Sequence, residues 1–282
     1  MKIAIIGGDL RQIYAAKYLK QNFDVRIYGF DEVFDDVKDC LKISLHDAAQ
    51  GADAVILGVP STDGDYICAK NFSGKIKIEE LINSMTVGQI LLGGRLSYQI
   101  KELCEEKAIK FFDYFEREEL TVLNTIATAE GAIEIAMKET PYTLHGAKTL
   151  VCGFGNVGKT LAKLLLSLGC EVYCTYRKQK DKSWIEVLGG KPVEAKLIKS
   201  AAENANIIFN TVPHKIISAD ILENISNNTV IIDLASKPGG VDFEAAQRLN
   251  KKVIWALSIP GKVAPQTAGK VISDTIINIL SE

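Results

Sequence analysis

The sequence lacks the features of several protein classes. Its six cysteines contain no C-x-x-C pair and its three histidines have no metal-ligand spacing, so no metal site is expected. No run approaches the ~20 apolar residues that a membrane-spanning helix needs. The apolar run after Lys2 ends at Gly7, too early for a signal-peptide core. We therefore expect a soluble cytoplasmic protein, with Cys152, Cys170 and Cys174 as buried free thiols in apolar strands.

An excess of charge of one sign is also missing. The 33 Lys and Arg against 35 Asp and Glu leave a net charge of -2, too balanced for a protein that coats nucleic acid or an anionic membrane. Hydrophobic residues make up 47% and charged residues 24%, which argues against disordered or low-complexity classes. The 282 residues suit one large or two medium globular domains. We expect no nucleic-acid or membrane partner.

What the sequence does contain is a βαβ pattern that occurs twice. Short β-branched runs alternate with amphipathic helical patterns, which is typical of a mostly parallel sheet. KIAIIGG in the first half is matched by KTLVCGFG in the second, and ADAVILGVP by ANIIFNTVP. The runs begin at Lys2, Ala52, Val87 and Ala108 in the first copy and at Lys148, Ala205, Asn228 and Lys251 in the second. We predict an α/β fold of two doubly wound Rossmann-like domains with parallel sheets.

Two long helices complete the predicted organisation. Apolar positions in Glu116–Glu139 recur at helical spacing, which predicts a helix that joins the domains. Val263–Leu280 has a similar pattern and predicts a helix that crosses back and closes the domains into a cleft. The predicted division is a substrate-side domain over 1–120, a nucleotide-binding domain over 121–262, and a C-terminal helix over 263–282 that packs back across both domains.

The segment GFGNVGKT at Gly153–Thr160 fits two phosphate-binding motifs. As G-x-G-x-x-G it is the dinucleotide fingerprint: its glycines allow a tight turn, the approach of a pyrophosphate at Gly155, and helix–strand packing at Gly158. As G-x-x-x-x-G-K-T it is a P-loop, in which Lys159 would meet a γ-phosphate and Thr160 magnesium. The motif alone does not decide between them.

Context favours the dinucleotide. The run EVYCTY is followed by Arg177 and Lys178, where a dinucleotide fold reads the adenosine ribose. An acidic residue there binds the 2′-hydroxyl of NAD, whereas a basic one accommodates the 2′-phosphate of NADP. We predict NADP, with NAD as the second choice. VIID, which ends at Asp233, resembles the magnesium-binding strand of a P-loop NTPase, so that enzyme class is the alternative.

The predicted coenzyme contacts lie in the glycine turn and at the carboxyl ends of the following strands, where an open α/β sheet holds its ligand. They are Gly153, Phe154, Gly155, Asn156, Val157, Gly158, Thr175, Tyr176, Arg177, Lys178, Asn210, Thr211, Val212, Pro213, Leu234, Ala235 and Ser236. The segments at 210–213 and 234–236 should line the nicotinamide half.

The first copy, with Gly7-Gly8-Asp9-Leu10-Arg11, lacks the second and third glycines, so we expect no dinucleotide there. Its strand ends are polar instead. Arginine forms paired hydrogen bonds with carboxylates, so Arg11 and Arg95 are predicted to hold an acidic substrate, with a surface ion pair as the alternative for each. The predicted substrate contacts are Asp9, Arg11, Ser61, Thr62, Gly94 and Arg95.

Lys262 lies in a Pro- and Gly-rich segment directly before the last helix. We predict that it faces an anion together with the free amides of that helix start; ordinary helix capping is the alternative.

Five segments together resemble the family of the dipicolinate synthase A subunit. They are GGDLRQ at Gly7–Gln12, TAEGAI at Thr128–Ile133, GFGNVG at Gly153–Gly158, DLASKPGGVDF at Asp233–Phe243 and SIPGKVAPQTAG at Ser258–Gly269. The glycine motif is shared by many dehydrogenases, whereas SKPGG and PGKVAPQTAG are distinctive. The resemblance covers nearly the whole chain.

The resemblance implies an oxidoreductase that acts on CH–CH groups in the mother cell of a sporulating bacterium. It would oxidise dihydrodipicolinate, or its hydrated tetrahydro form, from the lysine and diaminopimelate pathway to dipicolinate, and would work with the B subunit of dipicolinate synthase. Glu130, His214 and Lys262 are the candidate catalytic residues, the first two for proton transfer. A non-catalytic NADP-binding protein that supports the B subunit is a further alternative. We also expect a homo-oligomer.

Overall fold

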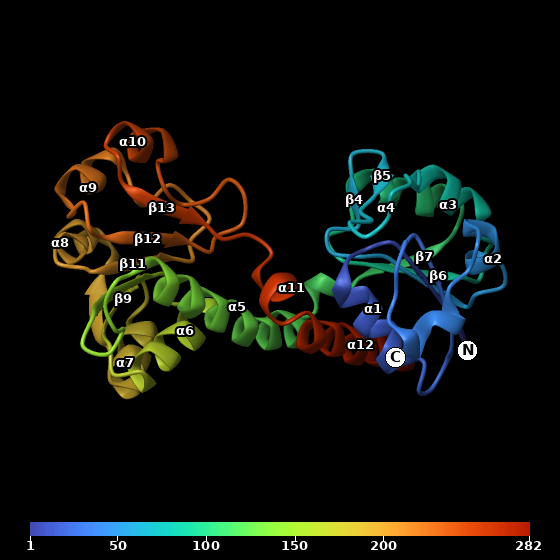
Figure 1. The fold of residues 1–282 in the computed structure, drawn as a ribbon, viewed down its shortest axis with the longest axis horizontal. Helices are drawn as coiled ribbons and strands as arrows, with labels where there is room; N and C mark the ends of the chain where they lie inside the picture. The colour runs from blue at the N-terminus through green and yellow to red at the C-terminus, as the bar shows by residue number, and fades with distance from the viewer. The chain divides into compact units, whose positions relative to one another are not determined.

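A computed structural model describes all 282 residues, Met1–Glu282. The chain forms two compact units (Figure 1): unit 1 consists of residues 1–124 and 264–282, and unit 2 of residues 125–263. Each unit contains a parallel sheet with helices on both faces, which confirms the predicted α/β class with two Rossmann-like domains. None of the helices combines the length and apolar composition needed to cross a bilayer.

Unit 1 has a five-stranded parallel sheet in the order β2-β1-β3-β6-β7. Its strands are β1 Lys2–Ile6, β2 Asp24–Tyr28, β3 Ala54–Ile56, β6 Ile90–Gly93 and β7 Lys110–Asp113. Residues 3–6 of β1 are fully buried, as expected for a central strand covered on both faces. A short antiparallel hairpin, β4 Thr62–Asp63 and β5 Tyr66–Ile67, follows β3.

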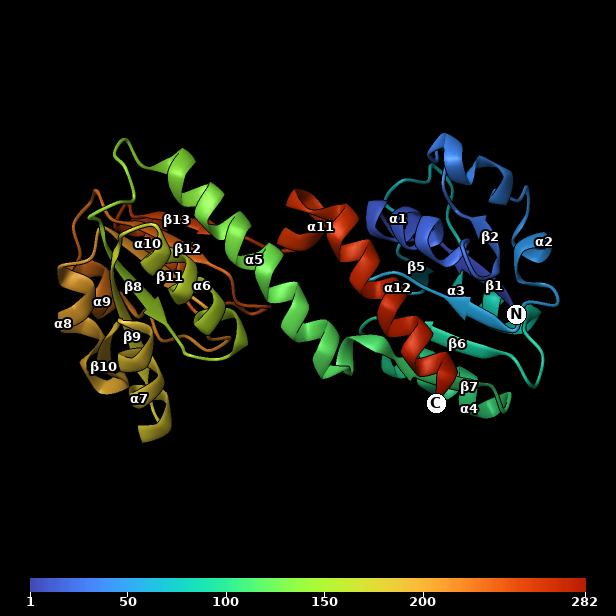
Figure 2. The ribbon, with the colours of Figure 1, turned by 90° about the horizontal axis from the view of Figure 1, so that it is seen from below.

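The helices of unit 1 come from both ends of the chain. They are α1 Leu10–Leu19, α2 Leu45–Ala49, α3 Ile78–Ser84, α4 Tyr98–Glu106 and α12 Pro265–Ser281, with 3-10 turns η1 Asp35–Cys40 and η2 Tyr114–Glu116. Helix α12 packs along α1 (Figure 2). A Cβ at Gly269 would lie only 2.6 Å from the carbonyl oxygen of Arg11, so the absence of a side chain permits this close approach.

Unit 2 has a six-stranded parallel sheet in the order β10-β9-β8-β11-β12-β13. Its strands are β8 Lys148–Cys152, β9 Glu171–Tyr176, β10 Lys191–Glu194, β11 Ile207–Asn210, β12 Val230–Asp233 and β13 Lys252–Trp255. The strand order reverses between β8 and β11, which creates the switch point where open α/β sheets bind their ligands. All eight strand runs predicted from the repeat contain a strand.

Helices cover both faces of this second sheet. Helices α6 Asn156–Ser167 and α7 Gln179–Leu188 lie on one face, and α8 Ile198–Glu203, α9 Ala219–Asn224 and α10 Phe243–Arg248 on the other (Figure 1). A 3-10 turn η3 Ala195–Leu197 precedes α8, and α11 Ile259–Val263 follows β13. Helix α5, Glu118–Glu139, contains the unit boundary, and its buried Ala129, Ala132 and Ala136 belong to the core of unit 2.

The six cysteines are all free, and Cys152, Cys170 and Cys174 are buried, as predicted. Burial raises the pKa of Cys174 to about 12. A thiol in that state is a poor nucleophile at neutral pH, so these residues act as small core side chains.

Candidate coenzyme site

The glycine turn after β8 is shaped by close backbone contacts. Gly153 has a φ of +94°, a conformation that favours glycine, and a Cβ there would lie 2.6 Å from Thr211 Oγ1. A Cβ at Gly158 would lie 2.2 Å from the carbonyl oxygen of Gly153. Two of the three glycines are therefore required by the packing of the protein itself.

Gly155 differs from the other two glycines. A Cβ built on it meets no atom within 4 Å, and its φ of -78° is ordinary for any residue. It is the N-cap of the 12-residue helix α6, and no side chain caps the amides of the first turn, which begins with Asn156 and Val157. Free amides at the positive end of a helix form an anion-binding site. The open space at Gly155 thus fits the diphosphate of a dinucleotide.

Two threonines hold this turn in place. The amide of Gly153 donates to Thr175 Oγ1 at 2.8 Å, and Thr211 Oγ1 donates to the carbonyl of Cys152 at 2.9 Å. Thr175 is only 6% exposed. Its hydroxyl therefore supports the turn from the protein side, whereas the sequence pattern had suggested a contact with the coenzyme.

The end of β9 presents two cations to solvent. Arg177 and Lys178 directly follow Tyr176 and are both exposed. Neither side chain makes a hydrogen bond or an ion pair. Because β9 is the neighbour of β8 in the sheet, these charges lie beside the strand that carries the glycine turn, where a dinucleotide fold reads the adenosine ribose.

A buried polar pair connects the loops after β11 and β12. Asn210 and Asp233 are both 0% exposed, and Asn210 Nδ2 donates to Asp233 Oδ1 at 2.7 Å. Asn210 also bonds both backbone groups of Val212, as donor to the carbonyl at 3.0 Å and as acceptor from the amide at 3.1 Å. The predicted nicotinamide-side segments are thus held by one fully paired network.

The same network contradicts the P-loop alternative. Asp233 accepts hydrogen bonds from Asn210, from the amide of Ala235 at 3.0 Å and from the amide of Gly240 at 2.8 Å. Both of its oxygens are engaged, and the residue is fully buried. Thr160 Oγ1 donates to the carbonyl of Asn156 at 3.1 Å, within its own helix. The proposed magnesium ligand Asp233 is therefore not available to a metal, which argues against a P-loop.

The corresponding turn of unit 1 is covered by its own chain. The amide of Gly8 donates to the carbonyl of Cys68 at 2.6 Å, and the amide of Lys70 donates to the carbonyl of Gly8 at 2.8 Å. A Cβ at Gly7 would lie 3.0 Å from Cys68 O. The segment after the β4–β5 hairpin thus packs directly against the β1 turn.

Asp9 and Arg11 form a closed pair at the start of α1. Arg11 Nε and Nη2 donate to the two carboxylate oxygens of Asp9 at 2.9 and 2.8 Å, and Nη2 also donates to the carbonyl of Val59 at 2.6 Å. Arg11 is only 6% exposed. Burial by itself raises the pKa of Asp9, but hydrogen bonds and charge from Arg11 bring it below the ordinary value. The charge of Arg11 is already neutralised, so the predicted contact with a substrate carboxylate is not supported by this geometry.

Ser61 and Gly94, both predicted substrate contacts, join two loops of unit 1. Ser61 is fully buried and donates to the carbonyl of Gly94 at 3.0 Å, and a Cβ at Gly94 would lie 2.2 Å from Val59 Cγ2. Thr62 Oγ1 lies 3.5 Å from Ser97 Oγ. Ser61 and Gly94 are therefore packing residues of the loops that follow β3 and β6.

Arg95, unlike Arg11, is not paired with a carboxylate. Its guanidinium is exposed, has no acidic partner, and lies 4.8 Å from the ring centre of Phe115. Its φ of +56° is unusual for a residue other than glycine, and the carboxylate of Asp113 accepts from its amide at 3.0 Å and from that of Leu96 at 2.8 Å. Strained, well-anchored residues of this kind are frequent at functional sites, and Arg95 keeps its role as a candidate carboxylate ligand.

Comparison with known proteins agrees with these features. Residues 2–115 match the family model for the N-terminal domain of the dipicolinate synthase A subunit, and residues 123–253 match that of the D-isomer specific 2-hydroxyacid dehydrogenase NAD-binding domain. The dipicolinate synthase A subunit of Bacillus subtilis (strain 168) is 30% identical over 100% of this chain and 96% of its own length. The chain belongs to the dipicolinate synthase A-subunit family.

Two crystal structures of this family have the same fold. The dipicolinate synthase A subunit from Bacillus halodurans superposes with a TM-score of 0.90 at 27% identity, over 100% of this chain and 98% of that chain. The corresponding protein from Bacillus subtilis gives 0.89 at 29% identity, over 100% and 96%. As a member of this family with a dehydrogenase-type NAD-binding domain, the chain is an oxidoreductase that uses a nicotinamide coenzyme.

The three residues that the sequence suggested as catalytic candidates lie in unit 2. Glu130 is on α5, His214 follows β11, and Lys262 is in α11; all three are exposed, and none makes a side-chain hydrogen bond or an ion pair. Lys262 lies within α11, which ends at Val263, and α12 begins at Pro265. Their catalytic roles remain predictions.

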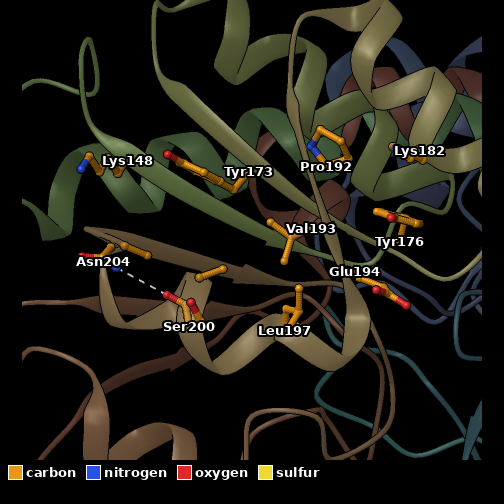
Figure 3. A pocket seen from close by; sticks show the side chains of 12 residues that line it. Lys148, Tyr173, Tyr176, Lys182, Pro192, Val193, Glu194, Leu197, Ser200 and Asn204 are labelled. Carbon is orange, nitrogen blue, oxygen red and sulfur yellow. Dashed lines mark hydrogen bonds between the residues drawn. The ribbon is translucent and has the colours of Figure 1, made fainter.

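A separate groove of about 600 Å³ runs between β9, β10 and α8 (Figure 3). Its apolar lining includes Tyr173, Tyr176, Val193 and Leu197, and its charged lining residues are Lys148, Lys182 and Glu194. Except for Tyr176, no residue predicted to bind the coenzyme lines it. This groove is therefore distinct from the anion-binding turn at Gly155.

Proposed function

We propose that this chain is an NADP-dependent dehydrogenase that oxidises dihydrodipicolinate, or its hydrated tetrahydro form, to dipicolinate. The observation that carries the proposal is the open helix start at Gly155, followed one strand away by the unpaired cations Arg177 and Lys178. Membership of the dipicolinate synthase A-subunit family supports the choice of substrate. We further propose that the chain works with the B subunit of that enzyme in the cytoplasm of a sporulating mother cell.

Several groups of the chain would have defined tasks in this reaction. The first-turn amides of α6 bind the diphosphate, and Arg177 with Lys178 binds the 2′-phosphate. Arg95 binds a carboxylate of the substrate. A bound nicotinamide coenzyme would supply the two-electron acceptor. Glu130 or His214 takes the proton that leaves as the ring becomes aromatic, and for a hydrated substrate an acid must also help to expel water.

The direct test is turnover by the purified chain. Mixed with dihydrodipicolinate and NADP⁺, it should produce dipicolinate and reduced coenzyme in equal amounts, followed by the near-ultraviolet absorbance of the reduced nicotinamide and by chromatography of the acid. Turnover only after addition of the B subunit would favour a coenzyme-binding protein without chemistry of its own. No coenzyme binding in either case would refute the proposal.

Removing the positive charge at the end of β9 should change coenzyme preference. Hydrogen bonds to charged groups contribute about 1.5–3 kcal/mol, so Arg177→Ala should raise the Kd of NADPH roughly tenfold to hundredfold. The Kd of NADH should change little, because NADH has no 2′-phosphate. Coenzyme fluorescence titration measures both. Lys163→Ala, at an exposed position of α6, is the control, and an unchanged NADPH affinity in Arg177→Ala would remove Arg177 from the site.

A further inference from the structure

One buried carboxylate, that of Asp233, bonds both ends of the loop 235–240 that follows β12. Asp233, at the end of the strand, accepts from the amide of Ala235 through Oδ1 at 3.0 Å and from the amide of Gly240 through Oδ2 at 2.8 Å. The side chain is fully buried and is also bonded to Asn210. Both ends of the 235–240 segment are thus fixed to the same group.

Further contacts shape the rest of this loop. Trp255 Nε1 donates to the carbonyl of Ala235 at 3.0 Å, and the amide of Gly239 donates to the carbonyl of Ser236 at 2.8 Å. The amides of residues 216 and 217 both donate to the carbonyl of Gly240 at 3.0 Å. What remains exposed is the tip of the loop, Ser236, Lys237 and Pro238. The tip is therefore presented by an anchored loop.

Lys237 is an uncompensated positive charge at this place. Its side chain makes no hydrogen bond and no ion pair. The lysine of the neighbouring loop after β11, Lys215, lies 3.3 Å from the carboxylate of Asp242. Of these two lysines, only Lys237 is free to meet an anion. The sequence pattern predicts a contact between the neighbouring Ser236 and the coenzyme, but it predicts no binding role for Lys237.

We propose that Lys237 binds a carboxylate of the substrate beside the nicotinamide half of the coenzyme, and that Asp233 is the positioning residue that holds its loop. The inference rests on the proposed function. Ligands of open α/β sheets lie outside the carboxyl ends of the strands at the switch point, and β12 is the second strand beyond it. Because the loop backbone is already anchored, binding of an anion by Lys237 does not have to order the loop as well.

The test compares Lys237→Gln with Lys215→Gln as a matched control. The affinity for dipicolinate, measured by calorimetry on the full chain saturated with NADPH, should fall about tenfold to hundredfold in Lys237→Gln, the loss of one charge-assisted hydrogen bond. The dipicolinate affinity of Lys215→Gln should equal that of the wild type. The Kd of NADPH should match the wild type in both variants, and in turnover the KM should rise in Lys237→Gln with little change in kcat.

The outcomes separate this inference from the proposed function. Unchanged dipicolinate affinity in Lys237→Gln, with normal NADPH binding, would overturn the role of Lys237 alone. A wild-type chain that binds no NADPH would overturn both.

Asp233→Asn tests the positioning role. It keeps the shape of the side chain but turns an amide donor toward the N–H of Ala235 or Gly240. Dipicolinate affinity should fall as in Lys237→Gln, and the double variant should lose no more than either single variant, because both act through one contact. Additive losses would contradict the positioning role. If Asp233→Asn does not fold, the comparison of Lys237→Gln with Lys215→Gln decides the proposal.

Discussion

Replacing Gly155 with valine should strongly weaken coenzyme binding and leave the apo-protein folded. The structure offers room for the new side chain, because no atom lies within 4 Å of the Cβ position and the backbone conformation suits any residue. That room is the space proposed for the diphosphate. Displacing the diphosphate removes hydrogen bonds from the first-turn amides that contribute about 1.5–3 kcal/mol each. We expect NADPH affinity to fall by about a hundredfold or more.

Coenzyme fluorescence titration measures the affinity, and thermal unfolding without coenzyme measures stability. Gly158→Ala provides the contrast. Its Cβ would lie 2.2 Å from the carbonyl oxygen of Gly153, so it should lower both the melting temperature and the affinity. NADPH binding of wild-type strength in Gly155→Val would show that the diphosphate does not approach this turn.

Removing Arg11 should destabilise unit 1 strongly at neutral pH. Arg11→Met leaves the carboxylate of Asp9 without its partner and the carbonyl of Val59 without its donor. Breaking a buried ion pair on one side costs about 3–5 kcal/mol, which urea denaturation measures. Asp9→Asn combined with Arg11→Met should be more stable than Arg11→Met alone, since no buried charge then lacks compensation. Equal stability of Arg11→Met and wild type would refute the structural role of Arg11.

The difference in the free energy of unfolding between Arg11→Met and the wild type should depend on pH. In the wild type the pKa of Asp9 is below its ordinary value, so the pair contributes stability above about pH 4, the usual pKa of an unfolded Asp. This stability is lost as the pH falls through the folded pKa. In Arg11→Met the buried carboxylate lacks its counter-charge and is stabilised by protonation. The difference in the free energy of unfolding between the two proteins, measured by urea denaturation, should therefore become smaller as the pH falls. A larger difference in acid would contradict the assignment of a stabilising ion pair between Asp9 and Arg11.

Local patterns in the sequence were sufficient for most of the fold. Strands such as Lys148–Cys152 appear as continuous apolar runs because both faces of a parallel sheet are buried. The duplicated order of those runs predicted two domains. Strands β2 and β10 had no such signal and were not predicted, because charged residues such as Arg26 and Lys191 leave these short strands without a continuous apolar run.

The site was predicted less completely, for a different reason. A residue type indicates which bonds a side chain is able to form, but not which of them the fold has already used. Arg11 and Arg95 look equivalent in the sequence; the structure pairs Arg11 with Asp9 and leaves Arg95 without an acidic partner. Thr175 supports the glycine turn, and Asp233 is a loop anchor although it ends a strand that resembles a magnesium-binding one.

The sequence alone therefore determined the α/β class, the two Rossmann-like domains, the glycine turn and the resemblance to the dipicolinate synthase A-subunit family, since each depends on residues close together in the chain. Tertiary structure decided which charges are free and which glycine faces open space. Those properties depend on contacts between segments far apart in sequence, such as Arg11 with Val59 and Asp233 with Asn210. No local pattern records such contacts, because they form only when the strands assemble into a sheet.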